Sequence, residues 1–155
     1  MIVGKMTLSR FNGDEIFGIE SATIDHDQYE DGLFATTFRA DTHAVAIQAL
    51  PDTASFRAHP FAEVTLQLSK SPALALRKGS TFAIPKGHDE RTHEYHTNFY
   101  YYEYQPMDEN QITILEREGL RVRARITGTV ADVNFYDGSK PRTKVTIEAD
   151  FTLSI

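Results

Sequence analysis

The sequence contains no cysteine and no tryptophan among its 155 residues. Without cysteine, the chain has no disulfide framework, no thiol nucleophile and no cysteine-ligated zinc or iron–sulfur cluster. No stretch approaches the roughly 20 consecutive apolar residues that a membrane-spanning helix needs. The first residues also lack an apolar run long enough for a secretory signal. We therefore expect a soluble, cytoplasmic protein that does not enter a membrane.

Basic residues are outnumbered, with 16 Lys and Arg against 22 Asp and Glu, which gives a formal net charge of −6. This acidic balance argues against a general nucleic-acid-binding protein, because such proteins neutralise phosphates with clustered basic side chains. A glycine-rich phosphate loop and a Gly-x-Ser-x-Gly nucleophile elbow are also missing. These absences favour a protein without a catalytic site over an enzyme.

Hydrophobic residues make up 41% of the chain, and they include 10 Phe and 7 Tyr. So many large aromatic side chains need a core, which rules out disorder for most of the chain. The length is that of one ordinary domain. We therefore expect a single domain over residues 1–155.

The dominant sequence period is two, which is typical of strands with one buried face. Apolar residues alternate with polar ones over 120–133 and again over 144–155. The Asp-Gly dipeptide at 137–138 predicts a hairpin turn between them, and pairing about that turn places Val130 opposite Val145. A slip by an even number of residues would preserve the faces. On the polar face we interpret Arg121, Arg123 and Arg125 as solvated partners of Glu148 and Asp150 rather than as a phosphate-binding row.

The N-terminal segment repeats this arrangement. The Asn-Gly dipeptide at 12–13 predicts a turn that joins a strand over 2–10 to a strand over 15–24. Pairing about that turn places Leu8 opposite Phe17. A second hairpin is therefore expected at the start of the chain.

Between the hairpins the pattern predicts further strands, an ambiguous segment and two short helices. Residues 42–50 combine alanines that favour helix with an alternation that favours strand, and we assign them to a strand. Asp52 could cap a short helix over 52–59, and Ser71 a second one over 71–79. Further strands are expected at 33–40, 61–69, 81–85, 98–104 and 112–118. Strands at this spacing predict a mainly β fold, an antiparallel β-sandwich or flattened barrel with one or two short helices.

The densest polar segment is the loop around 87–96, which contains His88, His93 and His96 among acidic residues. A divalent transition metal is commonly bound by two or three imidazoles and a carboxylate. A solvated loop with surface histidines explains the same residues. A metal site at these three histidines is therefore an alternative hypothesis, and no other cofactor is expected.

The most unusual segment is the aromatic run from Phe99 to Tyr104. On a strand, Tyr100, Tyr102 and Tyr104 would share one face. Tyrosine has an apolar body and a polar tip, which suits half-wet interfaces and flat sugar rings. We expect these three side chains to edge a groove or a subunit contact rather than to lie deep in the core.

Together these patterns favour a non-catalytic binding or interaction protein. Its recognition surface would be the tyrosine-rich strand and the adjacent histidine-rich loop. The partner would be another protein or a second copy of the chain, in a homo-oligomer, and neither nucleic acid nor a membrane. Two alternatives stay open: a metal-binding protein or metal-dependent enzyme using the loop histidines, and a carbohydrate-binding domain using the three tyrosines.

Overall fold

The computed structural model describes residues 1–43 and 46–155. Strands account for most of this part of the chain, and the helical segments are one turn each. The strands are β1 (Gly4–Arg10), β2 (Gly13–Ile19), β3 (Ser21–Gln28), β4 (Phe34–Asp41), β5 (Phe61–Leu68), β6 (Thr81–Ile84), β7 (His88–Asp89), β8 (Glu94–Tyr95), β9 (Thr97–Tyr100), β10 (Tyr104–Gln105), β11 (Asp108–Glu118), β12 (Arg121–Val130) and β13 (Thr143–Leu153). The helical turns are a 3₁₀ segment, η1 (Ala54–Phe56), and α1 (Pro72–Ala75).

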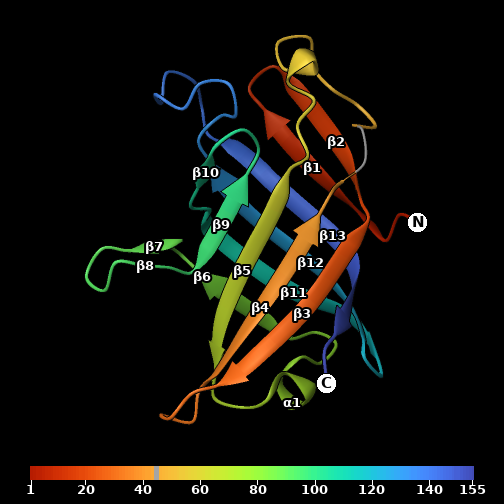
Figure 1. Ribbon diagram of the computed structural model, residues 1–155, viewed down its shortest axis with the longest axis vertical. Helices are drawn as coiled ribbons and strands as arrows, with labels where there is room; N and C mark the ends of the chain where they lie inside the picture. Colours follow the sequence, from red (N-terminus) through yellow and green to blue (C-terminus); the bar gives the residue numbers. More distant parts are fainter. Residues whose placement is uncertain (44–45) are drawn as a thin grey trace.

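One curled sheet forms the body of the molecule. Its strand order is β10-β9-β5-β4-β3-β13-β12-β11-β6, and β1 pairs with both β13 and β2. All pairs are antiparallel except β3 and β13, which join in parallel over Thr23–Thr152 and Ile24–Leu153. The sheet turns a corner there, so that β3, β4 and β5 lie in front of β11, β12 and β13 (Figure 1). The predicted mainly β fold of sandwich or flattened-barrel type is confirmed.

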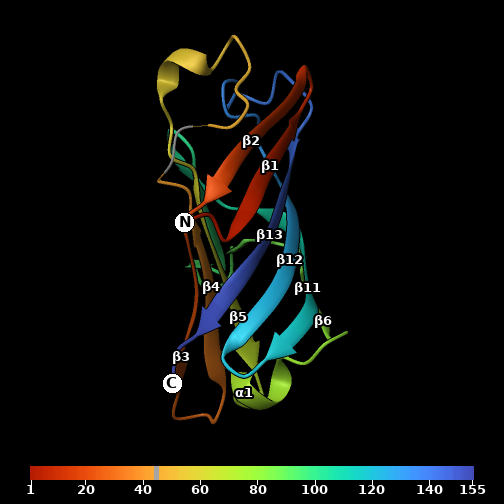
Figure 2. The ribbon, with the colours of Figure 1, turned by 90° about the vertical axis from the view of Figure 1, so that its right-hand side faces the viewer.

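The core lies between the two facing halves of the sheet, which Figure 2 shows almost edge-on. Phe38 of β4 and Phe151 of β13 meet there edge-to-face, with their ring centroids 5.3 Å apart. Both rings are buried, as are the alternate apolar residues of β12 and β13 that the sequence predicts to face inward. The two-residue period therefore arises because each long strand has one face on this core.

In the C-terminal hairpin the register differs from the prediction by two residues. Val130 pairs with Thr143 rather than Val145, and Val122 pairs with Phe151. The connection is longer than a two-residue turn because Asp132 and Phe135 form a tight bridge of their own. An even shift leaves every side chain on its predicted face.

The N-terminal hairpin shows the same kind of shift. Arg10 pairs with Gly13, so residues 11 and 12 form the turn and Leu8 lies opposite Glu15 instead of Phe17. Gly13 has a φ of 138°, a conformation that side-chain-bearing residues rarely adopt. The glycine therefore follows the turn instead of occupying its centre.

The segment between β4 and β5 differs from the prediction. Residues 44–45 of the predicted strand over 42–50 lie outside the described residues. In the described remainder, Gln48 makes only an isolated bridge to Ile16. The predicted helix over 52–59 is only the turn η1, and Asp52 does not cap it because its carboxylate binds Arg10.

The predicted helix over 71–79 is shorter than expected, since it covers only Pro72–Ala75. The predicted strand over 98–104 is interrupted at 101–103, where the chain bends before β10. No helix in the described part of the chain combines the length and apolar character needed to cross a membrane.

Candidate binding site

The curled sheet is not closed. β6 is an edge strand, and β5, although it lies between β4 and β9, pairs with β9 along only half of its length. On its outer side β5 pairs with β9 only from Phe61 to Val64, and the N–H of Thr65 then donates to the carbonyl of His96 at 2.8 Å. Among the described residues, no strand continues this pairing beyond Thr65. Of the described strands, β11 alone pairs with β6. Two strand edges therefore face a common gap.

Backbone groups of both strands point into this gap. In an antiparallel strand, successive residues direct their N–H and C=O groups to opposite sides. Since Thr65 donates away from β4, Gln67 also directs its N–H and C=O toward the free edge. On β6, Ser80 accepts from the N–H of Ile114 at 2.9 Å, so Thr81 and Ala83 direct their backbone groups away from β11. Peptide groups that have no partner among the described residues thus flank the gap.

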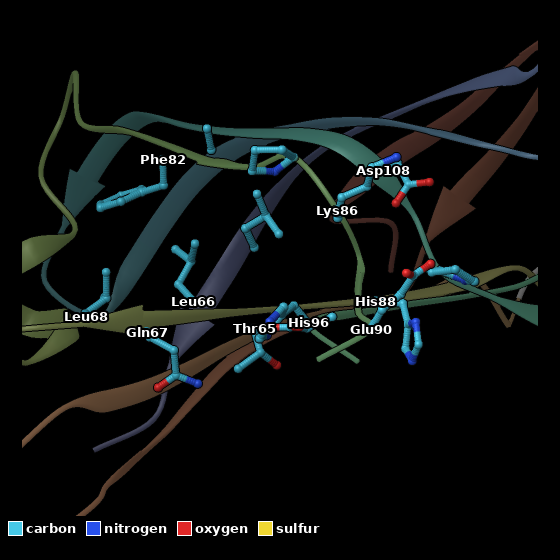
Figure 3. A pocket seen from close by; sticks show the side chains of 15 residues that line it. Thr65, Leu66, Gln67, Leu68, Phe82, Lys86, His88, Glu90, His96 and Asp108 are labelled. Carbon is cyan, nitrogen blue, oxygen red and sulfur yellow. The ribbon is translucent and has the colours of Figure 1, made fainter. Parts of the chain in front are cut away.

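A groove of about 990 Å³ occupies this gap. Figure 3 shows Leu66 and Leu68 of β5 and Phe82 of β6 around it. Leu66 and Leu68 belong to the buried core, and Phe82 packs against that core while half-exposed. The groove therefore combines an apolar floor with polar strand edges.

The histidine-rich loop forms one end of the groove and is held in place at Gly87. The N–H of Gly87 donates to Asp108 Oδ1 at 2.9 Å, and its carbonyl accepts from the N–H of His96 at 2.7 Å. A Cβ at this position would lie 2.1 Å from Thr97 Oγ1 and 2.4 Å from the Met107 carbonyl oxygen. Only glycine fits here, so the hairpin of β7 and β8 starts from a fixed point.

The three predicted metal ligands are not brought together. His88 and His96 line the groove, whereas His93 lies in the turn between β7 and β8 with a φ of 58°. The ring of His88 packs on Tyr95, with the centroids 4.5 Å apart. Among the described residues, no group of three or more histidine and carboxylate side chains has an arrangement that could hold a metal ion.

The three predicted tyrosines lie at the other end of β9, where two of them pair with each other and the third packs on a phenylalanine. The rings of Tyr100 and Tyr104 are 4.8 Å apart and tilted by 45°. Tyr102 packs instead on Phe56, at 5.4 Å. Tyr102 and Tyr104 are 62% and 69% exposed. They are available to a partner, but the three rings do not form one flat stacking platform.

A buried charge cluster, absent from the sequence predictions, lies at the end of the sheet near the β1–β2 turn. Arg10 donates through Nε and Nη2 to Asp132, both at 2.9 Å. It also donates through Nη1 and Nη2 to Asp52, at 2.8 and 2.7 Å, and through Nη1 to Glu15 at 3.3 Å. The side chains of Arg10, Glu15 and Asp132 have no exposed surface. Three carboxylates thus converge on one guanidinium.

Hydroxyl groups complete the cluster. Glu15 accepts from the Thr53 hydroxyl at 2.6 Å and from the Tyr101 hydroxyl at 2.9 Å. The hydrogen bonds from Arg10 lower the pKa of Asp52 to about 2. Burial acts to raise the pKa of Asp132, but the hydrogen bonds from Arg10, the Asn134 N–H and the Thr143 hydroxyl, together with the charge of Arg10, outweigh it and lower that pKa. Each of these groups is hydrogen-bonded, as buried charges must be, and the cluster joins four separate segments.

The sequence carries a signal for this cluster. Arg10 and Glu15 fall on the inward face of their strands, in step with Met6, Leu8 and Phe17. Charged residues at inward positions indicate either an ion-pair cluster or a site, since an unpaired charge there would be prohibitively costly.

Comparison with known proteins adds no assignment to this geometry. No protein-family model matches the chain, and neither a curated protein nor a solved structure is found to be similar to it.

Proposed function

We propose that this is a non-catalytic binding protein that captures an extended segment of a partner polypeptide in the groove between β5 and β6. The observation that carries the proposal is the pair of unpaired strand edges on either side of an apolar floor. An added strand would hydrogen-bond to these edges, as in other cases of β-strand addition.

Free strand edges promote uncontrolled aggregation, and proteins usually protect them by charge, bulges or covering segments. Such cover exists just after β12, where the side chain of Gln105 bonds to both backbone groups of Ala131, at 3.1 and 2.8 Å. The edge of β2 is covered by the residues around Gln48. The β5 and β6 edges have no such cover in the described part of the chain, which favours a functional opening.

The directions of the strands define how a guest segment would bind. β5 and β6 run antiparallel to each other, as follows from the strand pairings that connect them around the sheet. A guest strand is therefore antiparallel to one and parallel to the other. Its side chains alternate between the floor and solvent, so the guest needs apolar residues at every second position.

Charged and polar side chains lie at the rim of the groove. Lys86 and His88 lie at the rim together with Asp89 and Glu90. The histidine-rich part of the predicted recognition surface thus belongs to this site. The exposed Tyr102 and Tyr104 lie outside it, and a self-association role for them remains a separate prediction.

The proposal is tested by selecting binders from a displayed library of random peptides and measuring their affinities by fluorescence anisotropy. Ala83→Pro removes the free N–H of β6. No ladder bond is broken, because this N–H is directed away from β11, and the edge of a strand tolerates proline. Ala83→Val is the matched control, since it keeps the N–H. We expect Ala83→Pro to weaken binding by about tenfold, the effect of one lost hydrogen bond plus an unpaired partner group.

Phe82→Ala tests the floor independently and should weaken the same peptides, whereas Ala83→Val should leave their affinity within about twofold of the original protein. Selected peptides should alternate apolar and polar residues. Peptides that bind all three variants equally, or a selection that yields no extended peptide, would overturn the proposal.

A further inference from the structure

A second cavity, separate from the β5–β6 groove, lies between β2, residues 46–59 and Tyr101. Its volume is about 360 Å³, within the range of small-molecule sites. The rings of Phe17 and Tyr101 form its floor, edge-to-face at 6.0 Å, and both are buried. Alanine side chains, including Ala54 and Ala58, line the walls. The cavity is therefore mostly apolar, with two aromatic rings at its base.

Cationic and polar groups stand at its opening. Arg57 and His59 line the cavity and are exposed. Within the described part of the chain, neither side chain has an ion-pair or hydrogen-bond partner. Arg10, Arg39 and Arg125, by contrast, each bind a carboxylate. The acidic chain thus leaves an arginine without a carboxylate beside an apolar cavity.

The backbone at Arg57 supports a positioned side chain. Its φ is 50°, in the left-handed region that non-glycine residues seldom occupy. Such conformations often occur at ligand-binding positions, where the surrounding structure holds the strained residue. Here the conformation ends η1 at a residue that lines the cavity.

From these observations we propose that the cavity binds a small aromatic carboxylate. The apolar body would lie on Phe17 and Tyr101, and the carboxylate would pair with the Arg57 guanidinium, whose planar fork matches its two oxygens. His59 would contribute a further polar contact at the opening. The site does not depend on the β5–β6 groove, so either proposal can fail alone.

The test uses 2-naphthoate and its neutral analogue 2-naphthalenemethanol, measured by isothermal titration calorimetry. We expect the carboxylate to bind about tenfold more tightly than the alcohol, as one charge-assisted pair implies. Arg57→Asn removes the charge while suiting the left-handed backbone, and should abolish this preference without changing alcohol binding. Arg57→Lys should keep part of it.

Two further variants locate the site. Ala54→Leu fills the cavity and should weaken the binding of both compounds. Arg91→Asn, at an exposed arginine of the histidine-rich loop, should change neither affinity. Equal binding of acid and alcohol, or an unchanged preference in Arg57→Asn, would overturn the proposal. Three other results would also overturn it: unchanged affinity for both compounds in Ala54→Leu, loss of binding of both compounds in Arg57→Asn, and no binding of either compound to the original protein.

Discussion

Phe151 lies where the two halves of the sheet press together, edge-on to Phe38 and without exposed surface. Truncating a buried phenylalanine removes its transfer free energy and leaves a cavity, which typically costs about 3–5 kcal/mol. We expect Phe151→Ala to lower the free energy of unfolding by that amount in denaturant titrations. A value within experimental error of the original protein would show that β13 does not pack as described.

Tyr102 is the matching exposed aromatic residue, 62% exposed and in contact with Phe56. Substitutions at such positions usually change stability by within about 0.5 kcal/mol. We therefore expect Tyr102→Ser to keep the fold. If the tyrosine pairs form a self-association surface, the same variant should sediment as a smaller species than the original protein. A variant that unfolds, or that leaves the association state unchanged, would remove this surface from consideration.

At the scale of single elements, the free edges of β5 and β6 predict a pattern of amide exchange. Leu66 and Phe82 direct their N–H groups into the ladders with β4 and β11, whereas Gln67 and Ala83 direct theirs into the groove. Hydrogen exchange measured by NMR should therefore be fast at Gln67 and Ala83 and slow at Leu66 and Phe82. Equal protection of neighbouring amides would mean that the two edges pair with each other in solution.

The elements differ in how well the sequence predicts them. The faces of β12 and β13 follow from alternation, and they are correct despite a two-residue shift because strand parity does not depend on turn length. The turn residues located both hairpins but not their registers, because Gly13 follows the first turn and the Asp-Gly dipeptide at 137–138 lies within a longer connection. The groove could not be predicted, because β5 and β6 follow one another along the chain but join opposite halves of the sheet, and their alternation does not reveal which strands become neighbours.

At the scale of the whole molecule, the Arg10 cluster connects parts of the chain that the sheet leaves separate. Arg10 and Glu15 come from the first hairpin, Asp52 from the segment before η1, and Asp132 from the loop after β12. Losing Arg10 would leave three carboxylates near one another without a cation. Breaking a buried ion pair by removing one partner typically costs about 3–5 kcal/mol. We expect Arg10→Met to be destabilised to this extent in denaturant titrations at neutral pH, and an unaffected variant would show that the cluster is dispensable.

The same cluster determines how the molecule responds to acid. The pKa of Asp52 is about 2 in the folded chain against an ordinary 3.8, and the pKa of Asp132 is also lowered. A carboxyl with a lowered folded-state pKa stabilises the fold above its unfolded-state value, and this contribution disappears as pH falls through the folded-state value. The free energy of unfolding should therefore fall between about pH 4 and pH 2.

Asp52→Asn tests the assignment, because asparagine keeps the size of the side chain and removes the charge that Arg10 binds. The variant should be less stable than the original protein at pH 7 and should lose less stability on acidification. Asp27→Asn, at an exposed position of β3, is the control and should follow the original curve. Parallel acid curves for Asp52→Asn and the original protein would place the acid sensitivity outside the cluster. The link between Arg10 and the segment before η1 would then not limit the stability of the whole molecule in acid.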